Sequence, residues 1–273
     1  MVLEIEVLSE KKGSNPGGKC ILSTINGNHK FYVKHCYNNR FCLKETSFRA
    51  FHQPFYEAIT FEMAYLIGLS VTDYYVIDNR DKKTRFIKSG VKPDIGIQEV
   101  YYFANSYHEL TKERNISLEN DIVEKELLYL DLLQISDIVG RSQNYFLDVE
   151  SGKITYLDLG CSFVNAHEGN IMFMKKHPKP LNKKEFNRFM KRLNEYLLRC
   201  NQGNFIKLAE FVNFPYFMKV PIIFSNGIYG MKSLSDLISQ TEIEEVVNRI
   251  AAGIKENRFL EKNGDSHYLK KIQ

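Results

Sequence analysis

The sequence predicts an α+β protein of two lobes, in which strands dominate before residue 103 and helices dominate after it. Residues 1–103 contain short alternating apolar runs separated by turns rich in glycine and asparagine, with one helical stretch among them. Residues 104–273 contain longer runs whose apolar side chains recur at three- and four-residue spacing. We therefore expect an N-terminal lobe at 1–103, a helical C-terminal lobe at 104–273, and a ligand cleft between them.

The composition is that of a folded, mildly basic protein. The chain has 273 residues, of which 44% are hydrophobic and 26% charged, and its net charge is 37 − 33 = +4. This charge is too small to indicate nucleic-acid binding. The five cysteines form no CxxC pair, so a reducing compartment is favoured over a disulfide framework or zinc site. With no signal peptide or membrane span visible, we expect a cytoplasmic protein, or one delivered into a host cell.

A glycine-rich loop lies between the first two predicted strands. Residues 2–8 alternate as a half-buried strand does, and a second apolar stretch begins at Ile21. The intervening segment contains Gly13, Ser14, Gly17, Gly18 and Lys19. Backbone N–H groups of such a loop can approach phosphate oxygens closely. The segment matches neither G-x-x-x-x-G-K-[ST] nor G-x-G-x-x-G, so a plain turn is the alternative.

The next elements carry a lysine and a glutamate. A strand at 31–34 follows the turn at Asn26-Gly27-Asn28 and ends on Lys34, which is either a rim residue or an inward charge aimed at a phosphate. The stretch from Pro54 to Gly68 predicts a helix. This helix contains Glu57 and Glu62, which project from different faces. Further strands are expected at 71–78, 84–88 and 96–102, followed by a connector at 104–106.

The second half predicts a long helix and then a hairpin. The helix spans Ser117–Ile135 with Ser117 as its N-cap, and the hairpin turns at Ser151-Gly152. The second strand of the hairpin delivers Asp158 into a turn that contains glycine. Further helices are expected at 183–200, 205–214, 233–240 and 242–257, and the polar tail at 262–273 is expected to be poorly ordered.

Asparagine and aspartate side chains near strand ends suggest a metal site. Asn144 precedes the hairpin and Asp158 follows it, within about two dozen residues of further acidic groups. Carboxylate and amide oxygens are suitable ligands for the Mg²⁺ ion of a nucleotide phosphoryl-transfer site. The structural alternatives are an aspartate that caps a turn and a buried loop asparagine.

These pieces, in this order, resemble the protein-kinase superfamily. More narrowly, they look like its atypical HipA-like and phosphatidylinositol-3-kinase-like bacterial branch, which includes a small translocated kinase. The resemblance covers about residues 8–165, and the helical remainder is compatible with it. It implies a two-lobed protein-kinase-like fold that uses ATP and Mg²⁺ to phosphorylate serine or threonine of a protein.

The resemblance implies a role for each element of the N-terminal lobe. Lys34 takes the place of the strand lysine that grips the nucleotide phosphates, and Glu57 that of its helix partner, with Glu62 as the alternative. Residues 13–19 stand where the branch has its phosphate loop, whose serine, here Ser14, is phosphorylated in related kinases. Glu99–Tyr102 would be the hinge, in which the backbone of Glu99 and Tyr101 contacts adenine.

In the C-terminal lobe the resemblance implies that Asp158 and Asn144 hold the metal. Relatives place the catalytic aspartate five residues before the asparagine, and this chain has Val139 there. Either the loop is two residues longer and Asp137 orients the acceptor hydroxyl, or the catalytic aspartate has been lost. Arg141 is the basic residue of this loop, and Asp131 is expected to be structural.

Three functions therefore remain open. The first is a serine/threonine kinase whose partners are ATP, a protein substrate, and an inhibitory antitoxin or a host protein. The second is a pseudokinase or ATP-binding interaction module, which Val139 favours. The third is a kinase that acts on an inositol lipid or another small molecule, against which the lack of a basic amphipathic helix argues.

Overall fold

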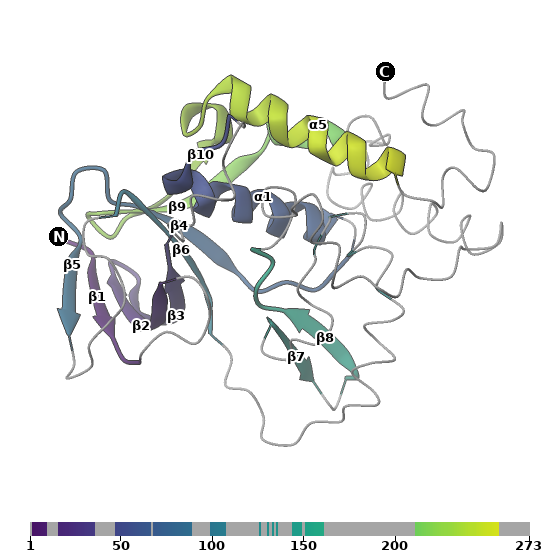
Figure 1. Cartoon of the computed structure of the whole chain (residues 1–273). Helices are drawn as coiled ribbons and strands as arrows, with labels where there is room; N and C mark the ends of the chain where they lie inside the picture. Colours follow the sequence, from purple (N-terminus) through teal and green to yellow (C-terminus); the bar gives the residue numbers. More distant parts are fainter. Residues whose placement is uncertain are drawn as a thin grey trace. The chain divides into compact units, whose positions relative to one another are not determined.

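The computed structural model (Figure 1) describes a defined set of residues: 2–9, 16–35, 47–66, 68–88, 99–107, 126, 130, 133, 135, 144–148, 151–160 and 211–256. Predictions that fall on other residues lie outside the described part of the chain. These include the loop residues Gly13 and Ser14, the helix at 183–200 and the polar tail.

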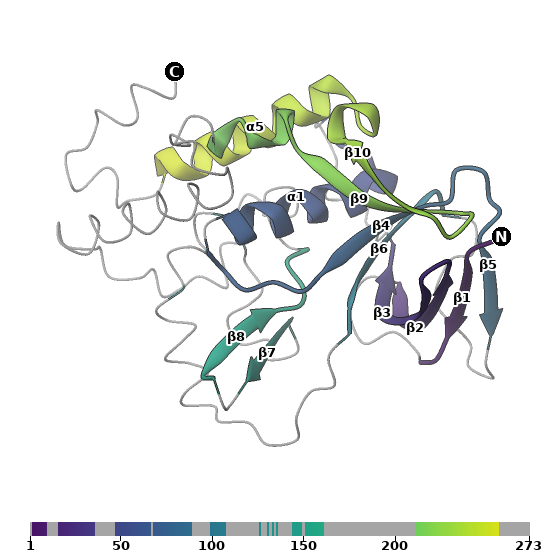
Figure 2. The same cartoon turned by 180° about the vertical axis from the view of Figure 1, so that it is seen from behind.

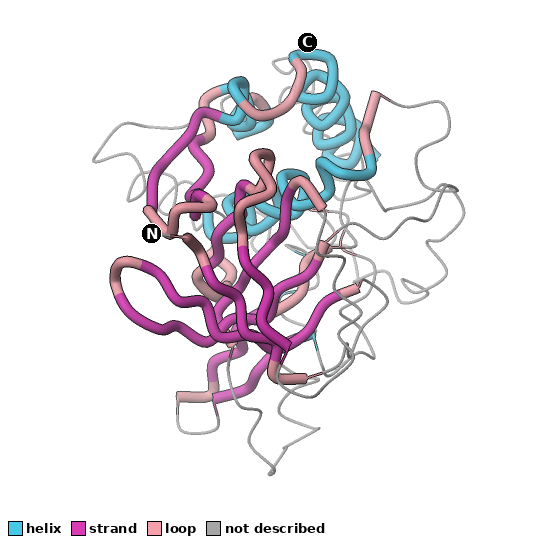
Figure 3. The backbone as a smooth tube through the Cα atoms, turned by 90° about the vertical axis from the view of Figure 1, so that its left-hand side faces the viewer, coloured by secondary structure: helices cyan, strands magenta, loops and turns pink. Residues whose placement is uncertain are grey.

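The dominant element is an eight-stranded, mostly antiparallel sheet, whose strands appear in magenta in Figure 3. Its order is β10-β9-β4-β6-β3-β2-β1-β5, and only the pairs β1–β5 and β4–β9 are parallel. The strands are β1 (Glu4–Val7), β2 (Gly17–Thr24), β3 (Gly27–Lys34), β4 (Tyr74–Asp78), β5 (Arg85–Lys88), β6 (Tyr101–Ser106), β9 (Lys219–Phe224) and β10 (Tyr229–Ser233). The predicted α+β class is confirmed.

One face of this sheet carries an apolar core that the alternation of the sequence predicts. Ile5 and Val7 on β1, and Leu3 just before it, are buried in the core, while Glu4 and Glu6 point away from it. The buried cluster continues across the sheet through Cys20, Leu22, Phe31, Val33, Ile77, Tyr102, Ala104 and Ile223. The strands expected near residues 2–8, 31–34, 71–78 and 84–88 are all present.

β9 and β10 are two strands that the sequence analysis did not predict. The run Val220–Phe224 forms a strand that pairs in parallel with β4, and a turn at Asn226-Gly227 returns the chain as β10. Gly227 has φ of +75°, which suits the glycine of such a turn. The helix expected at 233–240 is therefore wrong, because Ser233 ends β10 and a short 3-10 helix, η5 (Leu234–Asp236), follows.

Two α-helices have both ends within the described part of the chain. The first, α1 (Gln53–Leu66), is the predicted helix; Gly68, with φ of +92°, follows its end and adopts a left-handed conformation that is costly for other residues. The second, α5 (Gln240–Glu256), confirms the helix expected at 242–257. Neither helix is long and apolar enough to cross a lipid bilayer, and no other helix in the described ranges is.

The predicted hairpin is present as a two-stranded sheet of β7 (Tyr145–Asp148) and β8 (Lys153–Tyr156), shown from behind in Figure 2. Its turn lies at Ser151-Gly152, as expected. Tyr156 anchors the hairpin: its backbone N–H donates to the carbonyl of Ser70 at 2.8 Å, and its hydroxyl donates to Glu126 at 2.6 Å. Burial, and then the charge of Glu126, raises the pKa of this tyrosine.

The chain divides into two compact units. The first contains residues 1–58, 72–109 and 218–242, and the second contains 59–71, 110–217 and 243–273. These bounds differ from a single cut after residue 103, because the β9–β10 segment belongs to the first unit. The connector expected at 104–106 is also wrong, since those residues form the second half of β6.

The position of β9 inside the sheet makes a testable prediction. Ile222 is fully buried, so Ile222→Ala should lower the free energy of unfolding by about 3 kcal/mol through lost burial and a residual cavity. Ile228, in the turn after β9, is 44% exposed, and Ile228→Ala should cost less than about 0.5 kcal/mol. Urea unfolding of both variants measures this difference, and equal small effects would contradict the buried placement of β9.

Candidate functional site

The predicted site lysine and helix glutamate form an ion pair inside the first unit. Lys34 is the last residue of β3, and its Nζ contacts a carboxylate oxygen of Glu57 on α1. The two side chains are 4% and 2% exposed, and the Phe103 ring centroid lies 5.5 Å from the Lys34 Nζ. The structure therefore brings together the two residues that the family resemblance pairs. The partner of Lys34 in this ion pair is Glu57 and not the alternative, Glu62.

The strand register explains why Lys34 lies on the α1 face of the sheet. Phe31 and Val33 point into the apolar core on the other face, so Lys34 and Tyr32 point away from it. Lys34 stands opposite Gly17 on β2 and Phe103 on β6. A Cβ on Gly17 would lie 2.9 Å from the Lys34 Cβ, so glycine at this position lets the lysine stem lie against the neighbouring backbone.

Burial of both charges has an energetic implication. Removing an ammonium and a carboxylate from water costs several kcal/mol per ion, and apolar residues of the same size often stabilise a fold as well or better. Such a pair therefore need not contribute to the stability of the fold. It is better explained by a site that needs the Lys34 ammonium in a fixed position.

The glycines of the predicted phosphate loop have a packing role where they are described. A Cβ on Gly17 would lie 2.5 Å from the carbonyl oxygen of Val33, and one on Gly18 would lie 2.4 Å from that of Ser9. Both distances are shorter than any real contact, so only glycine fits at these positions on β2. Lys19, the next residue, donates a hydrogen bond to the hydroxyl of Tyr107. Gly13 and Ser14 lie outside the described residues.

The segment expected to be the hinge is tied to the end of β4. The carbonyl of Glu99 accepts a hydrogen bond from the Asn79 side chain at 2.9 Å, and that of Val100 accepts one from the Asn79 backbone at 2.9 Å. Tyr101 begins β6, and its buried ring packs against Phe55 with centroids 4.6 Å apart. Tyr101 thus supports the start of α1, and its contact with adenine stays a prediction.

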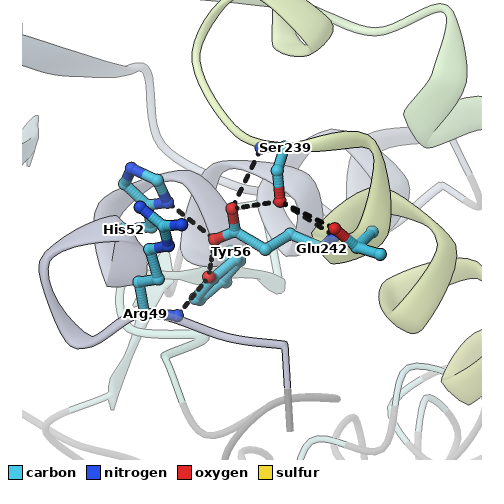
Figure 4. A network of polar contacts seen from close by, with 6 residues as sticks. Arg49, His52, Tyr56, Ser239 and Glu242 are labelled. Carbon is cyan, nitrogen blue, oxygen red and sulfur yellow. Dashed lines mark hydrogen bonds and ion pairs between the residues drawn. The ribbon is translucent and has the colours of Figure 1, made fainter.

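A buried carboxylate that the sequence analysis missed holds the start of α1 (Figure 4). Glu242, in the first turn of α5, is fully buried. One of its oxygens lies 2.6 Å from His52 Nδ1 and accepts a hydrogen bond from the Tyr56 hydroxyl. The other accepts from the Ser239 backbone at 2.9 Å and from its hydroxyl at 2.8 Å. Ser239-x-x-Glu242 is the capping-box pattern, a signal that is readable in the sequence.

The hydrogen bonds to Glu242 determine its ionisation. Burial raises the pKa of this carboxyl, but the hydrogen bonds from His52, Tyr56 and Ser239 together outweigh burial and lower the pKa from 4.5 to about 2. The same contact and burial raise the pKa of the Tyr56 hydroxyl, so this group donates to the carboxylate over the ordinary pH range. Glu242 is therefore an anion at neutral pH.

The two predicted metal ligands lie together in the second unit, at the open end of the β7–β8 hairpin. The carbonyl of Asn144 accepts hydrogen bonds from the backbone N–H groups of Leu157 at 2.8 Å and Asp158 at 3.3 Å. Asn144 is buried, and Asp158 is partly exposed. A carboxylate oxygen of Asp158 accepts from the N–H of Gly160 at 3.1 Å, which orders the turn after the strand.

The chemistry of this pair fits a hard cation. A carboxylate and an amide oxygen on adjacent backbone segments are the donors that Mg²⁺ takes when it keeps most of its water ligands. Within the described ranges no group of three or more His, Cys, Asp or Glu side chains is placed to bind a metal. Asp137, Val139 and Arg141 lie outside the described residues. The role of Asp137 in orienting the acceptor hydroxyl therefore stays a prediction.

Comparison of the chain with protein-family models, with curated proteins and with solved structures finds no match.

The buried ion pair predicts a specific pattern of stabilities. Lys34→Met or Glu57→Leu alone should lower the free energy of unfolding by about 3 kcal/mol, because each removes one member of a buried ion pair and leaves the other charge buried. The double variant should be more stable than either single variant. Arg85→Met, which breaks an exposed pair with Glu4, should cost less than about 1 kcal/mol. Additive losses in urea unfolding would contradict the coupling.

The low pKa of Glu242 predicts an acid-dependent loss of stability. Its folded-state pKa of about 2 lies below the ordinary 4.5, so its contribution is complete above pH 4.5 and disappears as the pH falls toward 2. This contribution is at most about 3 kcal/mol. Urea unfolding of wild type and Glu242→Gln should therefore give a difference that shrinks from about pH 6 to about pH 3. A constant difference would contradict the prediction.

Proposed function

We propose that the protein is an ATP- and Mg²⁺-dependent phosphotransferase, specifically a serine/threonine protein kinase of the HipA-like type with a two-lobed kinase-like fold. The observation that carries the proposal is the buried pair of Lys34 and Glu57, on a strand end and a helix of the first unit. Its supports are the glycines that precede Lys34 along the chain and the Asn144–Asp158 pair in the second unit.

The ion pair suits the binding of a nucleotide phosphate. A lysine ammonium is a compact cation with three donors, and it binds phosphate oxygens as a point charge. Glu57 holds this cation in place, while the Phe103 ring restricts the space around it. Phosphoryl transfer needs little covalent chemistry from the protein, so a fixed cation contributes by positioning and by stabilising charge.

Asn144 and Asp158 would hold the Mg²⁺ ion of the nucleotide. When bound, such an ion neutralises negative charge that develops on the transferred phosphoryl group and the leaving oxygen. The backbone hydrogen bonds between Asn144 and residues 157–158 keep both donors at one end of the hairpin. Asn144 is buried, so its amide would be a ligand that the protein shields from bulk water.

The remaining parts of the proposed site are assigned on sequence. The loop at Gly13–Lys19 would cover the phosphates, and Asp137 would orient the hydroxyl of the acceptor protein. The segment Glu99–Tyr102 would be the hinge whose backbone contacts adenine. The protein partner would be the substrate, with an antitoxin or a host protein as its regulator.

A binding module without transfer is the second candidate, and Val139 favours it. That residue stands where relatives of the proposed family carry the catalytic aspartate. Such a protein would keep Lys34, Glu57, Asn144 and Asp158 for nucleotide binding and would lack the group that orients the acceptor.

Transfer from labelled ATP tests the proposal directly. With Mg²⁺ and a generic protein substrate, we expect wild type to label itself or the substrate, and Asp158→Asn to lower the rate at least about a hundredfold by removing a metal ligand. Asp148→Asn is the matched control. It removes a carboxylate of the same hairpin that bonds Ser151 at 2.6 Å, so it should leave the rate within about twofold of wild type.

The other variants separate the two candidates. ATP with Mg²⁺ at about a hundred times its Kd should stabilise wild type by about 2.7 kcal/mol in thermal unfolding. Stabilisation without transfer, in wild type and Asp137→Ala alike, would favour the binding module. Transfer that is retained in Asp137→Ala but lost in Asp158→Asn would remove Asp137 from the mechanism and keep the kinase. Neither transfer nor stabilisation in wild type would refute both.

A further inference from the structure

We propose that Glu242 is a positioning residue, which holds α1 so that Glu57 meets Lys34. The inference rests on the proposed function for its catalytic consequence, but the contact itself lies entirely within the first unit. Glu242 is separated from His52 and Tyr56 by 190 and 186 residues of sequence. The C-terminal segment thereby controls the helix that carries the site glutamate.

The two oxygens of Glu242 have different partners. Oε2 accepts both hydrogen bonds of Ser239, which is the contact that caps α5. Oε1 faces α1: it lies 2.6 Å from His52 Nδ1 and accepts a hydrogen bond from the Tyr56 hydroxyl. A capping box needs only the first set of contacts. The second set therefore requires a separate explanation, and a clamp on α1 provides one.

Helix geometry connects this clamp to the ion pair. His52 and Tyr56 are four residues apart, so they project on the same side of the helical segment. Glu57 follows Tyr56 and is turned from it by about 100° around the axis, toward the sheet. Rotation of α1 about its axis would withdraw Glu57 from Lys34, and the same rotation would break both contacts to Glu242.

Two further contacts of Tyr56 also hold the start of α1 in place. The Tyr56 hydroxyl also accepts a hydrogen bond from the Arg49 backbone at 2.9 Å, which fixes the entry of the chain into η1 (Ala50–His52), the 3-10 turn before α1. The Tyr56 ring packs against Phe48 with centroids 4.7 Å apart. Glu242 is fully buried, so water cannot replace it as an acceptor for these groups.

A pair of matched variants separates positioning from capping. Tyr56→Phe removes a hydrogen bond to Oε1 and keeps the ring packing against Phe48. Ser239→Ala removes the side-chain hydrogen bond to Oε2 and leaves the α1 contacts in place. Both variants should lower the melting temperature. Only Tyr56→Phe should lower kcat for phosphate transfer, by roughly tenfold with little change in the KM for ATP, because fewer molecules hold the ion pair.

A second readout does not depend on activity. In protein labelled at lysine Cε with ¹³C, the Lys34 resonance, assigned by its loss in Lys34→Met, reports on its carboxylate neighbour. Glu57→Gln defines the shift that accompanies loss of that carboxylate. We expect Tyr56→Phe to move the Lys34 resonance part of the way toward this value, Glu242→Ala to move it further, and Ser239→Ala to leave it unchanged.

The outcomes are distinct. If Tyr56→Phe and Glu242→Ala leave the Lys34 resonance at its wild-type value, Glu242 only caps α5 and the inference is overturned. If the resonance moves as expected but wild type transfers no phosphate, the positioning role holds and the proposed function fails. If Glu242→Ala does not fold, Tyr56→Phe alone decides, since it removes a single hydroxyl.

Discussion

The buried ion pair between Lys34 and Glu57 is the constraint on which the first unit depends. Neither charge has access to bulk water, so each needs the other to offset the loss of hydration. The pair forms only when the β3 end and the start of α1 are both in place, with Gly17 and Phe103 on the flanking strands. Local structure and long-range packing are therefore coupled at one contact.

The far end of the described chain completes this arrangement. Residues 218–242 supply two strands of the sheet and the carboxylate of Glu242, so the first unit cannot assemble from the N-terminal residues alone. β9 pairs with β4 in parallel, a pairing that needs a long connection between the strands. Closing so long a loop costs conformational entropy that the contacts of β9 must offset.

Sequence patterns predicted the elements that local chemistry determines. Alternation gave β1 and β3, three- and four-residue spacing gave α1, and Ser151-Gly152 located the β7–β8 turn. The β9 strand was missed because Val220–Phe224 is a short apolar run, and periodicity alone does not distinguish a buried strand from a helix in such a run. The choice is made by pairing with β4, whose partner residues lie 146 positions earlier in the chain.

The site residues also differ in whether local sequence or the tertiary fold determines their contacts. Lys34 and Glu57 were paired through the resemblance to the kinase superfamily, and the structure shows the ion pair. The capping box at Ser239 was readable, but nothing local shows that the second oxygen of Glu242 contacts Tyr56. The role of Tyr101 depends in the same way on a ring of α1, that of Phe55. Partners that are remote in sequence are determined by the tertiary fold.

The β7–β8 hairpin positions Asn144 and Asp158, the two proposed metal ligands. Tyr145 pairs with Tyr156 at its open end, and Asn144 and Asp158 flank this pair of residues. The strand register therefore sets the spacing of the two ligands, whatever the length of the loop that contains Asp137. Lys34 and Glu57 are likewise held within their own unit. Under the proposed function, loss of the catalytic aspartate at Val139 would leave the proposed nucleotide-binding groups intact, so nucleotide binding would not require phosphate transfer.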